Sequence, residues 1–143
     1  MFDQKYMLGI PELDVQHKAI FAAARSLRDL IVKPGQGHLI HSALTGLREM
    51  LVVHFAEEEA FMTVIKCAEL DKHKESHVGI LQLIDDCIDR LSSHSNGREE
   101  FGQMIGDEVV GHIEDFDIRI ADTVKRLIDG LVNHEDIVGS SQR

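Results

Sequence analysis

The stretch LREMLVVHFAEEEAFMTVI, residues 47–65, places its apolar residues at the period of an α-helix. Three consecutive glutamates fall inside it, but only Glu58 lies four residues after His54 and therefore shares its face. Glu57 and Glu59 lie about 100° to either side, so we expect both to reach solvent. The stretch predicts a helix that directs a histidine and a glutamate into the core. Its inward stripe comprises Leu47, Leu51, His54, Glu58, Phe61 or Met62, and Ile65.

Three further segments show the same helical period, and none alternates apolar and polar residues as a half-buried strand would. Asp14 has the residue type of a helix N-cap. The pattern predicts an all-α protein, an antiparallel up-down-up-down four-helix bundle with a short N-terminal arm. The predicted helices span about 14–32, 38–65, 71–91 and 98–131, with breaks at KPGQG (33–37), CAEL (67–70) and SSHSNG (92–97).

The length and the polar end of the chain suggest one domain and a tail. A chain of 143 residues fits a single hydrophobic core. The last stretch, VNHEDIVGSSQR, is polar and ends in small residues. We therefore predict a bundle in residues 1–131 and a polar C-terminal tail or linker in residues 132–143.

Composition narrows the classes of partner. The formal charge of −10 argues against nucleic acid and anionic membranes, which favour basic patches. No apolar run approaches the roughly 18 residues that a membrane span needs, and no signal peptide is visible at the N-terminus. We expect a cytoplasmic monomer. Cys67 and Cys87 lack CxxC spacing, so we interpret them as small buried residues rather than redox groups.

Nine histidines are an unusual number for this length, and five of them fall on the apolar stripes. A single histidine in a core is usually satisfied by a hydrogen bond, but five converging on one core need a shared partner. A metal ion is such a partner, because neutral imidazole is a good ligand for iron, zinc, copper and nickel. The five are His17, His54, His73, His77 and His112; the histidines outside the stripes that we expect not to bind are His38, His41, His94 and His134.

The acidic ligands of the fourth helix are less certain from spacing. HIEDFD, residues 112–117, offers Glu114, Asp115 and Asp117. Asp117 lies five residues after His112, about 140° around an ideal helix, so it would need a local adjustment of the helix to share the site. Spacing alone leaves the choice among the three acids open.

Four motifs, one in each predicted helix, together resemble the hemerythrin family, most closely its single-domain bacteriohemerythrins. The resemblance covers about residues 2–127. It implies that His73, His77 and His112 bind one iron and that His17 and His54 bind a second. It also implies that Glu58 and Asp117 bridge the two iron ions, beside an oxo or hydroxo bridge. The motifs are LGIPELDVQHKAIF (8–21), HFAEEEAFM (54–62), HKESH (73–77) and HIEDFD (112–117).

That ligand set leaves one coordination position free on the iron with two histidines. The resemblance then implies reversible O2 binding, for storage or delivery, by a protein that is not an enzyme. The ferritin-like diiron enzymes use Glu-x-x-His pairs, which this sequence lacks. An alternative is an oxygen-sensing or redox-sensing module of a signalling protein. Turnover of nitric oxide or peroxide, and a structural zinc or metal-free bundle, are less favoured.

Overall fold

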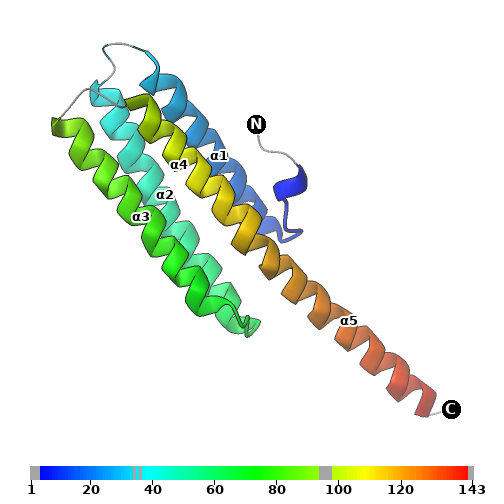
Figure 1. The fold of residues 1–143 in the computed structure, drawn as a ribbon. Helices are drawn as coiled ribbons and strands as arrows, with labels where there is room; N and C mark the ends of the chain where they lie inside the picture. Colours follow the sequence, from blue (N-terminus) through cyan, green and yellow to red (C-terminus); the bar gives the residue numbers. More distant parts are fainter. Residues whose placement is uncertain (1–3, 34, 36, 94–97, 142–143) are drawn as a thin grey trace.

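The computed structural model describes residues 4–33, 35, 37–93 and 98–141, and this part of the chain is helical with no strand (Figure 1). The all-α prediction is therefore confirmed. A 3-10 turn, η1, and five α-helices are joined in order, with a π-helix, η2, between the last two. The elements are η1 (Gln4–Tyr6), α1 (Pro11–Ile31), α2 (Gly37–Val64), α3 (Leu70–Ser93), α4 (Arg98–His112), η2 (Ile113–Asp117) and α5 (Ile118–Ser141).

The first four α-helices form a bundle in which α1 packs on α2 and α4, while α3 packs on α2 and α4. Leucine and isoleucine side chains fill most of its interior, as the sequence period predicts. A second, smaller cluster joins the N-terminal arm to the α2–α3 turn and to α5 through Leu8, Met62 and Ile120. The seven polar or charged residues of the candidate site lie in this same interior and are at most 5% exposed.

The N-terminal end of α1 differs from the prediction that Asp14 caps it. The helix begins at Pro11, with Ile10 at the N-cap position, because proline suits the first helical turn. The Asp14 carboxylate instead accepts the backbone N–H groups of Leu8 at 2.7 Å and Gly9 at 3.0 Å. Gly9 has a φ of +78°, which glycine adopts without strain. Asp14 therefore fastens the arm to the first turn of α1.

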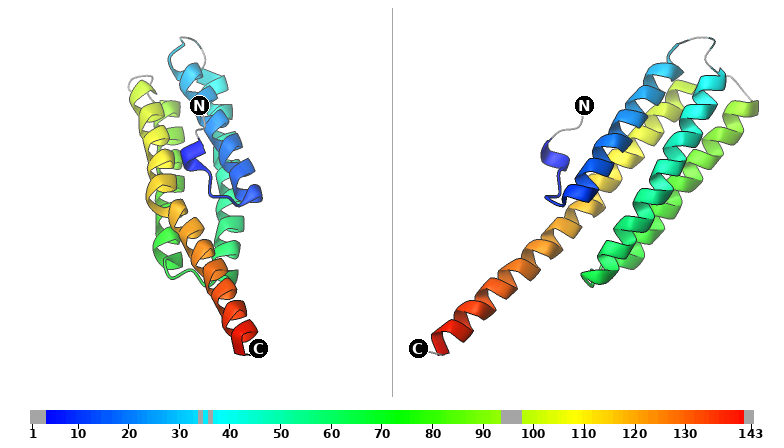
Figure 2. Two further views of the ribbon diagram at one scale, coloured as in Figure 1. Left: turned by 90° about the vertical axis from the view of Figure 1, so that its right-hand side faces the viewer. Right: turned by 180° about the vertical axis from the view of Figure 1, so that it is seen from behind.

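The last predicted helix, residues 98–131, corresponds to α4, η2 and α5 together. We expected it to end near Leu131, but α5 continues to Ser141 and projects beyond the other helices (Figures 1 and 2). Leu127, Ile128 and Leu131 on this projection are 48%, 54% and 66% exposed. The division into a bundle and a tail at residue 131 stays a prediction, but the segment after it is helical up to Ser141.

Two smaller predictions concern the α2–α3 turn and the thiols. The break at CAEL is present: Lys66 has a φ of +55°, and the Cys67 N–H donates to the Met62 carbonyl at 2.9 Å. This geometry ends α2. Cys67 and Cys87 are both buried free thiols. Among the described residues, no helix is long and apolar enough to cross a membrane.

Candidate metal centre

The structure brings together all seven residues that the sequence and the resemblance single out. Helices α1, α2, α3 and α4 and the π-helix η2 each contribute at least one of them, and their side chains meet inside the bundle. They form two groups of potential metal ligands, within each of which the ligand atoms lie within 4.8 Å of one another. The first group is Glu58, His73, His77, His112 and Asp117; the second is His17, His54, Glu58 and Asp117.

Glu58 belongs to both groups because its two oxygens face different histidines. Its Oε1 lies 2.5 Å from His73 Nε2 and 3.0 Å from His77 Nε2. Its Oε2 lies 3.0 Å from His54 Nε2 and 3.5 Å from His17 Nε2. The carboxylate is fully buried, at 0% exposure. One oxygen thus serves the three-histidine side and the other serves the two-histidine side.

Asp117 divides its oxygens in the same way. Its Oδ1 lies 2.8 Å from His73 Nε2 and 2.9 Å from His112 Nε2. Its Oδ2 lies 2.9 Å from His17 Nε2. Both carboxylates therefore lie between the two sets of imidazoles, each with one oxygen toward either set.

A π-helix explains how Asp117 reaches this position. In η2 the backbone N–H of Ile118 donates to the carbonyl of Ile113, five residues earlier instead of four. The turn holds one extra residue, so the side chain five positions after His112 returns to the same face. The 140° offset of an ideal α-helix is thereby removed. Glu114 and Asp115 remain exposed, which resolves the choice that spacing left open.

The carboxylates of the centre are held in their charged form. Burial raises the pKa of Glu58, but the close imidazoles of His112, His17, His54 and His73 outweigh it and keep that pKa well below its usual value. Burial and the charge of Glu58 also raise the pKa of Asp117. The close imidazoles of His112, His17 and His73 nevertheless lower it to about 2. Both carboxylates are therefore anionic at neutral pH.

The histidines respond to those charges. Burial lowers the pKa of His17 and His73, but hydrogen bonds and charges of Asp117 and Glu58 outweigh it and raise both values to about 9. For His77, burial and the charges of the neighbouring imidazoles outweigh the effect of Glu58, so its pKa is lowered. Protons on the imidazoles thus balance the two carboxylates when no metal is bound. Divalent ions would take the place of those protons.

Unsatisfied atoms in the centre fit a metal. Six buried side-chain atoms have no hydrogen-bond partner of good geometry in the described part of the chain. Imidazole nitrogens do lie near the carboxylate oxygens among them. Buried polar groups of native proteins are rarely left in this condition. Imidazole nitrogens and carboxylate oxygens together suit iron and related metals. The six atoms are Glu58 Oε2, Asp117 Oδ1 and Oδ2, and the Nδ1 atoms of His17, His73 and His77.

Other contacts orient the imidazoles, and the sequence did not predict them. His54 Nδ1 lies 2.6 Å from Gln16 Oε1, and His112 Nδ1 lies 2.6 Å from Ser76 Oγ. Phe116 stacks on His112, with ring centroids 5.3 Å apart and an interplanar angle of 14°. Gln16 and Ser76 each directly precede a histidine of the site, and Phe116 lies four residues after His112. These positions were the only indication of such contacts in the sequence.

A small cavity lies beside the cluster. His17, His54, His112 and Asp117 line it together with apolar side chains, including Ile20. Its volume of about 10 Å³ is close to the room that one water molecule needs. The space beside the cluster is therefore small and mostly apolar.

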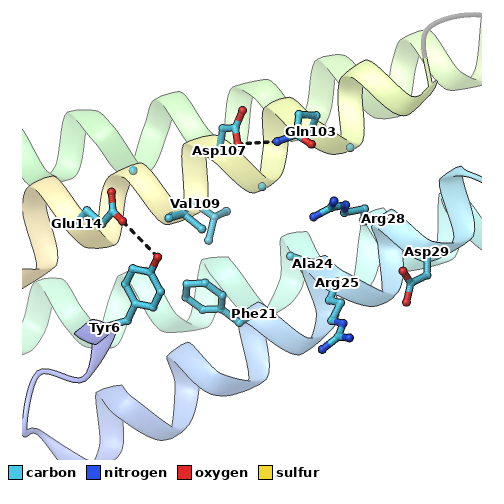
Figure 3. Close-up of a pocket in the computed structure, with 14 residues that line it drawn as sticks. Tyr6, Phe21, Ala24, Arg25, Arg28, Asp29, Gln103, Asp107, Val109 and Glu114 are labelled. Carbon is cyan, nitrogen blue, oxygen red and sulfur yellow. Dashed lines mark hydrogen bonds between the residues drawn. The ribbon is translucent and has the colours of Figure 1, made fainter. Parts of the chain in front are cut away.

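A groove of about 730 Å³ lies between α1 and α4, outside the metal centre (Figure 3). Tyr6 closes one end by stacking on Phe21, with ring centroids 5.2 Å apart, and by donating to Glu114 Oε1 at 3.2 Å. Arginine, acidic and glycine residues line the rest, and none of the clustered histidines does.

Three of the residues predicted to lie outside the centre are exposed, and a fourth is half-buried. Glu57 is exposed, as expected, and so are His38 and His41. Glu59 is half-buried, with Oε1 3.8 Å from His77 Nδ1, because it leans toward α3 instead of reaching fully into solvent. His94 and the side chain of His134 lie outside the described residues.

Comparisons with known proteins agree with this geometry. The model of the hemerythrin HHE cation binding domain matches residues 8–136, a range that includes every clustered residue. Hemerythrin-like proteins of Naegleria gruberi and Naegleria fowleri are each 29% identical over 118 residues, which cover 82% of this chain and 87% of the relative. No solved structure matches the chain. With nearly its whole length matched by the family model, the chain belongs to the hemerythrin family of HHE cation-binding domains.

Proposed function

We propose that this protein holds two iron ions among its helices and binds O2 reversibly at one of them. The observation that carries the proposal is the division of the Glu58 and Asp117 oxygens between two sets of histidines. A single metal ion would need one such set. Two carboxylates, each shared by both sets, fit a pair of ions instead.

The residues of the centre would have separate roles. His73, His77 and His112 would hold one iron, and His17 and His54 the other. Glu58 and Asp117 would bridge both, together with an oxo or hydroxo group. When bound, two ferrous ions can supply the two electrons that reversible capture of O2 requires.

The surroundings favour binding over catalysis. The small cavity beside the cluster is walled mostly by apolar side chains, among them Ile20, Leu51 and Ile80. Apart from the proposed ligands, no acidic or basic side chain lines it within the described residues. A small neutral molecule can enter such a space, but no further group is placed to give it a proton. We therefore propose a non-enzymatic role, in the cytoplasm.

Iron content and visible spectra test this proposal directly. The purified protein should contain about two irons per chain, and air should produce a visible band that disappears on deoxygenation and returns on re-exposure. Fewer than one iron per chain, or irreversible oxidation on first exposure to air, would contradict reversible binding. A steady consumption of nitric oxide or peroxide with a reductant would point to an enzyme.

A sensory role is the second candidate, favoured by the contact between Tyr6 and Glu114. Glu114 lies in the same π-helix as Asp117, so the N-terminal arm touches the element that carries a proposed bridge. A change at the irons could alter this contact. Hydrogen exchange of residues 4–10 and 113–117 should then differ between the deoxygenated and oxygenated forms. Equal exchange in both forms would favour storage or delivery.

A further inference from the structure

The hydrogen bond to His54 continues to the protein surface through two residues that are not in the metal centre. Gln16, on α1, lies beside both His54 and Glu57 of α2. Its Oε1 is 2.6 Å from His54 Nδ1, and its Nε2 donates to the Glu57 carboxylate. Gln16 is half-buried and Glu57 is exposed. A chain of hydrogen bonds thus runs from solvent to an imidazole of the two-histidine side.

The chemistry of the three groups fixes the direction of each bond. An ionised carboxylate only accepts hydrogen bonds, so the Gln16 amide must present its NH2 to Glu57. Its carbonyl oxygen then faces His54 and can only accept. The proton of a neutral His54 must therefore sit on Nδ1. Nε2 is left with a free lone pair.

That lone pair points into the metal centre. His54 Nε2 lies 3.0 Å from Glu58 Oε2 and 3.0 Å from His17 Nε2. An acceptor facing a carboxylate oxygen is unfavourable without a cation between them. The Nδ1–H tautomer is the one that a metal ion needs.

Few of the other imidazoles are held in this way. Within the described residues, the Nδ1 atoms of His17, His73 and His77 have no hydrogen-bond partner. Only His112 resembles His54, through Ser76 Oγ at 2.6 Å. On the two-histidine side, where the free coordination position is proposed, His54 is therefore the one imidazole with a hydrogen-bonded Nδ1.

We propose that Gln16 and Glu57 are positioning residues for the metal centre: Glu57 orients the Gln16 amide, and Gln16 holds His54 as the tautomer whose Nε2 binds metal. The inference rests on the proposed metal site but not on O2 binding. It gives Glu57, whose position on the helix predicts only a solvated carboxylate, a role in retaining and tuning the metal.

The test uses the full-length protein loaded with Fe(II) under anaerobic conditions. Iron affinity, from competition with a ferrous chelator, and the reduction potential are measured for Gln16→Leu, Gln16→Glu and the double variant Gln16→Glu/Glu57→Gln. Glu49→Gln, an exposed carboxylate on the same helix, is the matched control. Loss of a partner that orients a metal-binding histidine typically lowers metal affinity about 10-fold to 100-fold, and we expect that loss for Gln16→Leu.

The glutamate variants separate positioning from simple packing. Gln16→Glu alone faces Glu57 with a second carboxylate and should weaken iron binding. The double variant restores a donor, because the new amide at position 57 can donate to the new carboxylate at position 16. Iron affinity should then recover. The potential should fall below that of the wild type, since a charged acceptor makes the imidazole a stronger donor to Fe(III).

Two results would overturn the proposal: wild-type iron affinity and potential in Gln16→Leu, or a double variant no better than Gln16→Glu. The zinc-loaded protein gives a readout that does not depend on iron chemistry. It is diamagnetic, so ¹⁵N NMR should show a slowly exchanging Nδ1–H on His54, and Gln16→Leu should lose this protection. If the wild type binds metal but not O2, the proposed function fails while this test stands.

Discussion

The ring of Phe55 lies flat against the imidazole of His77, with ring centroids 3.8 Å apart and an interplanar angle of 9°. The two residues come from α2 and α3, and both are buried. His77 Nδ1 has no hydrogen-bond partner in the described part of the chain. Aromatic packing therefore sets the plane of this imidazole where a hydrogen bond sets the planes of His54 and His112.

Replacing Phe55 with leucine should weaken the metal centre more than the fold. A swap between apolar residues of similar size usually costs less than about 1.5 kcal/mol of unfolding free energy. The imidazole plane, however, loses its support, so iron per chain should fall. Metal analysis and urea unfolding measure the two effects separately. Phe21→Leu, which changes a ring that stacks on Tyr6 and lines the groove outside the centre, should leave iron content unchanged. Equal iron loss in both variants would refute a specific role for Phe55.

Replacing Asp117 with asparagine should lower iron content below that of the wild type. The amide keeps the shape but removes the charge, and with it one of the two proposed anionic bridges. Metal analysis after loading with excess Fe(II) gives the stoichiometry. Asp115→Asn is the matched control, because Asp115 is an exposed carboxylate two residues away. Iron loss in the control and not in Asp117→Asn would show that the bridge has been assigned to the wrong residue.

The metal-free protein should become less stable as the pH rises from about 6.5 to 9. The pKa values of His17 and His73 are raised from 6.5 to about 9 in the folded state. A group with a raised pKa stabilises the fold fully below its unfolded value and loses that contribution as the pH passes its folded value. Urea unfolding of the metal-free protein at pH 6, 7.5 and 9 measures the trend. Constant or rising stability across this range would contradict it.

Iron binding should show the opposite dependence on pH. Metal and protons compete for the same imidazole nitrogens, so iron affinity should increase over the window in which the metal-free fold weakens. The carboxylates contribute no trend there. The pKa of Asp117 is lowered from 3.8 to about 2, so its contribution is present above pH 3.8 and is lost only as the pH falls toward 2. Chelator competition at the same three pH values provides the comparison.

Helix α5 should stabilise the bundle only through the residues near its N-terminal end. Ile120 is fully buried in the cluster near the N-terminal arm, whereas Leu131 is 66% exposed. Ile120→Ala should lower the free energy of unfolding by about 2–5 kcal/mol. Leu131→Ala should change it by no more than about 0.5 kcal/mol. Similar losses for both variants would mean that the projecting helix packs on the bundle in solution.

The helical period predicted the long helices and the inward face of Glu58, because residues four apart share a face in any α-helix. Asp117 could not be chosen in this way. Its position depends on one backbone hydrogen bond that spans five residues, and this bond has no signature in the spacing of side chains. The resemblance singled out the acidic residue that the structure places beside the imidazoles, because the family motif includes the position of the aspartate.

Contacts between helices were also beyond the sequence. Gln16, Ser76 and Phe55 act across helix pairs, and their partners depend on how α1, α2 and α3 are rotated against one another. The start of α1 was placed three residues late because Asp14 has the character of a cap. Its carboxylate does accept backbone N–H groups, but those of the arm instead of those of its own helix.

The π-helix η2 lies at the base of the projecting α5. A helix of 24 residues begins directly after Asp117 and, at a rise of about 1.5 Å per residue, is about 36 Å long. A tilt of about 10° at its base would displace its far end by about 6 Å. Any change in the angle at which α5 leaves the π-helix is thus magnified along its length, so a small tilt at the bundle would become a movement of several ångströms at the tip.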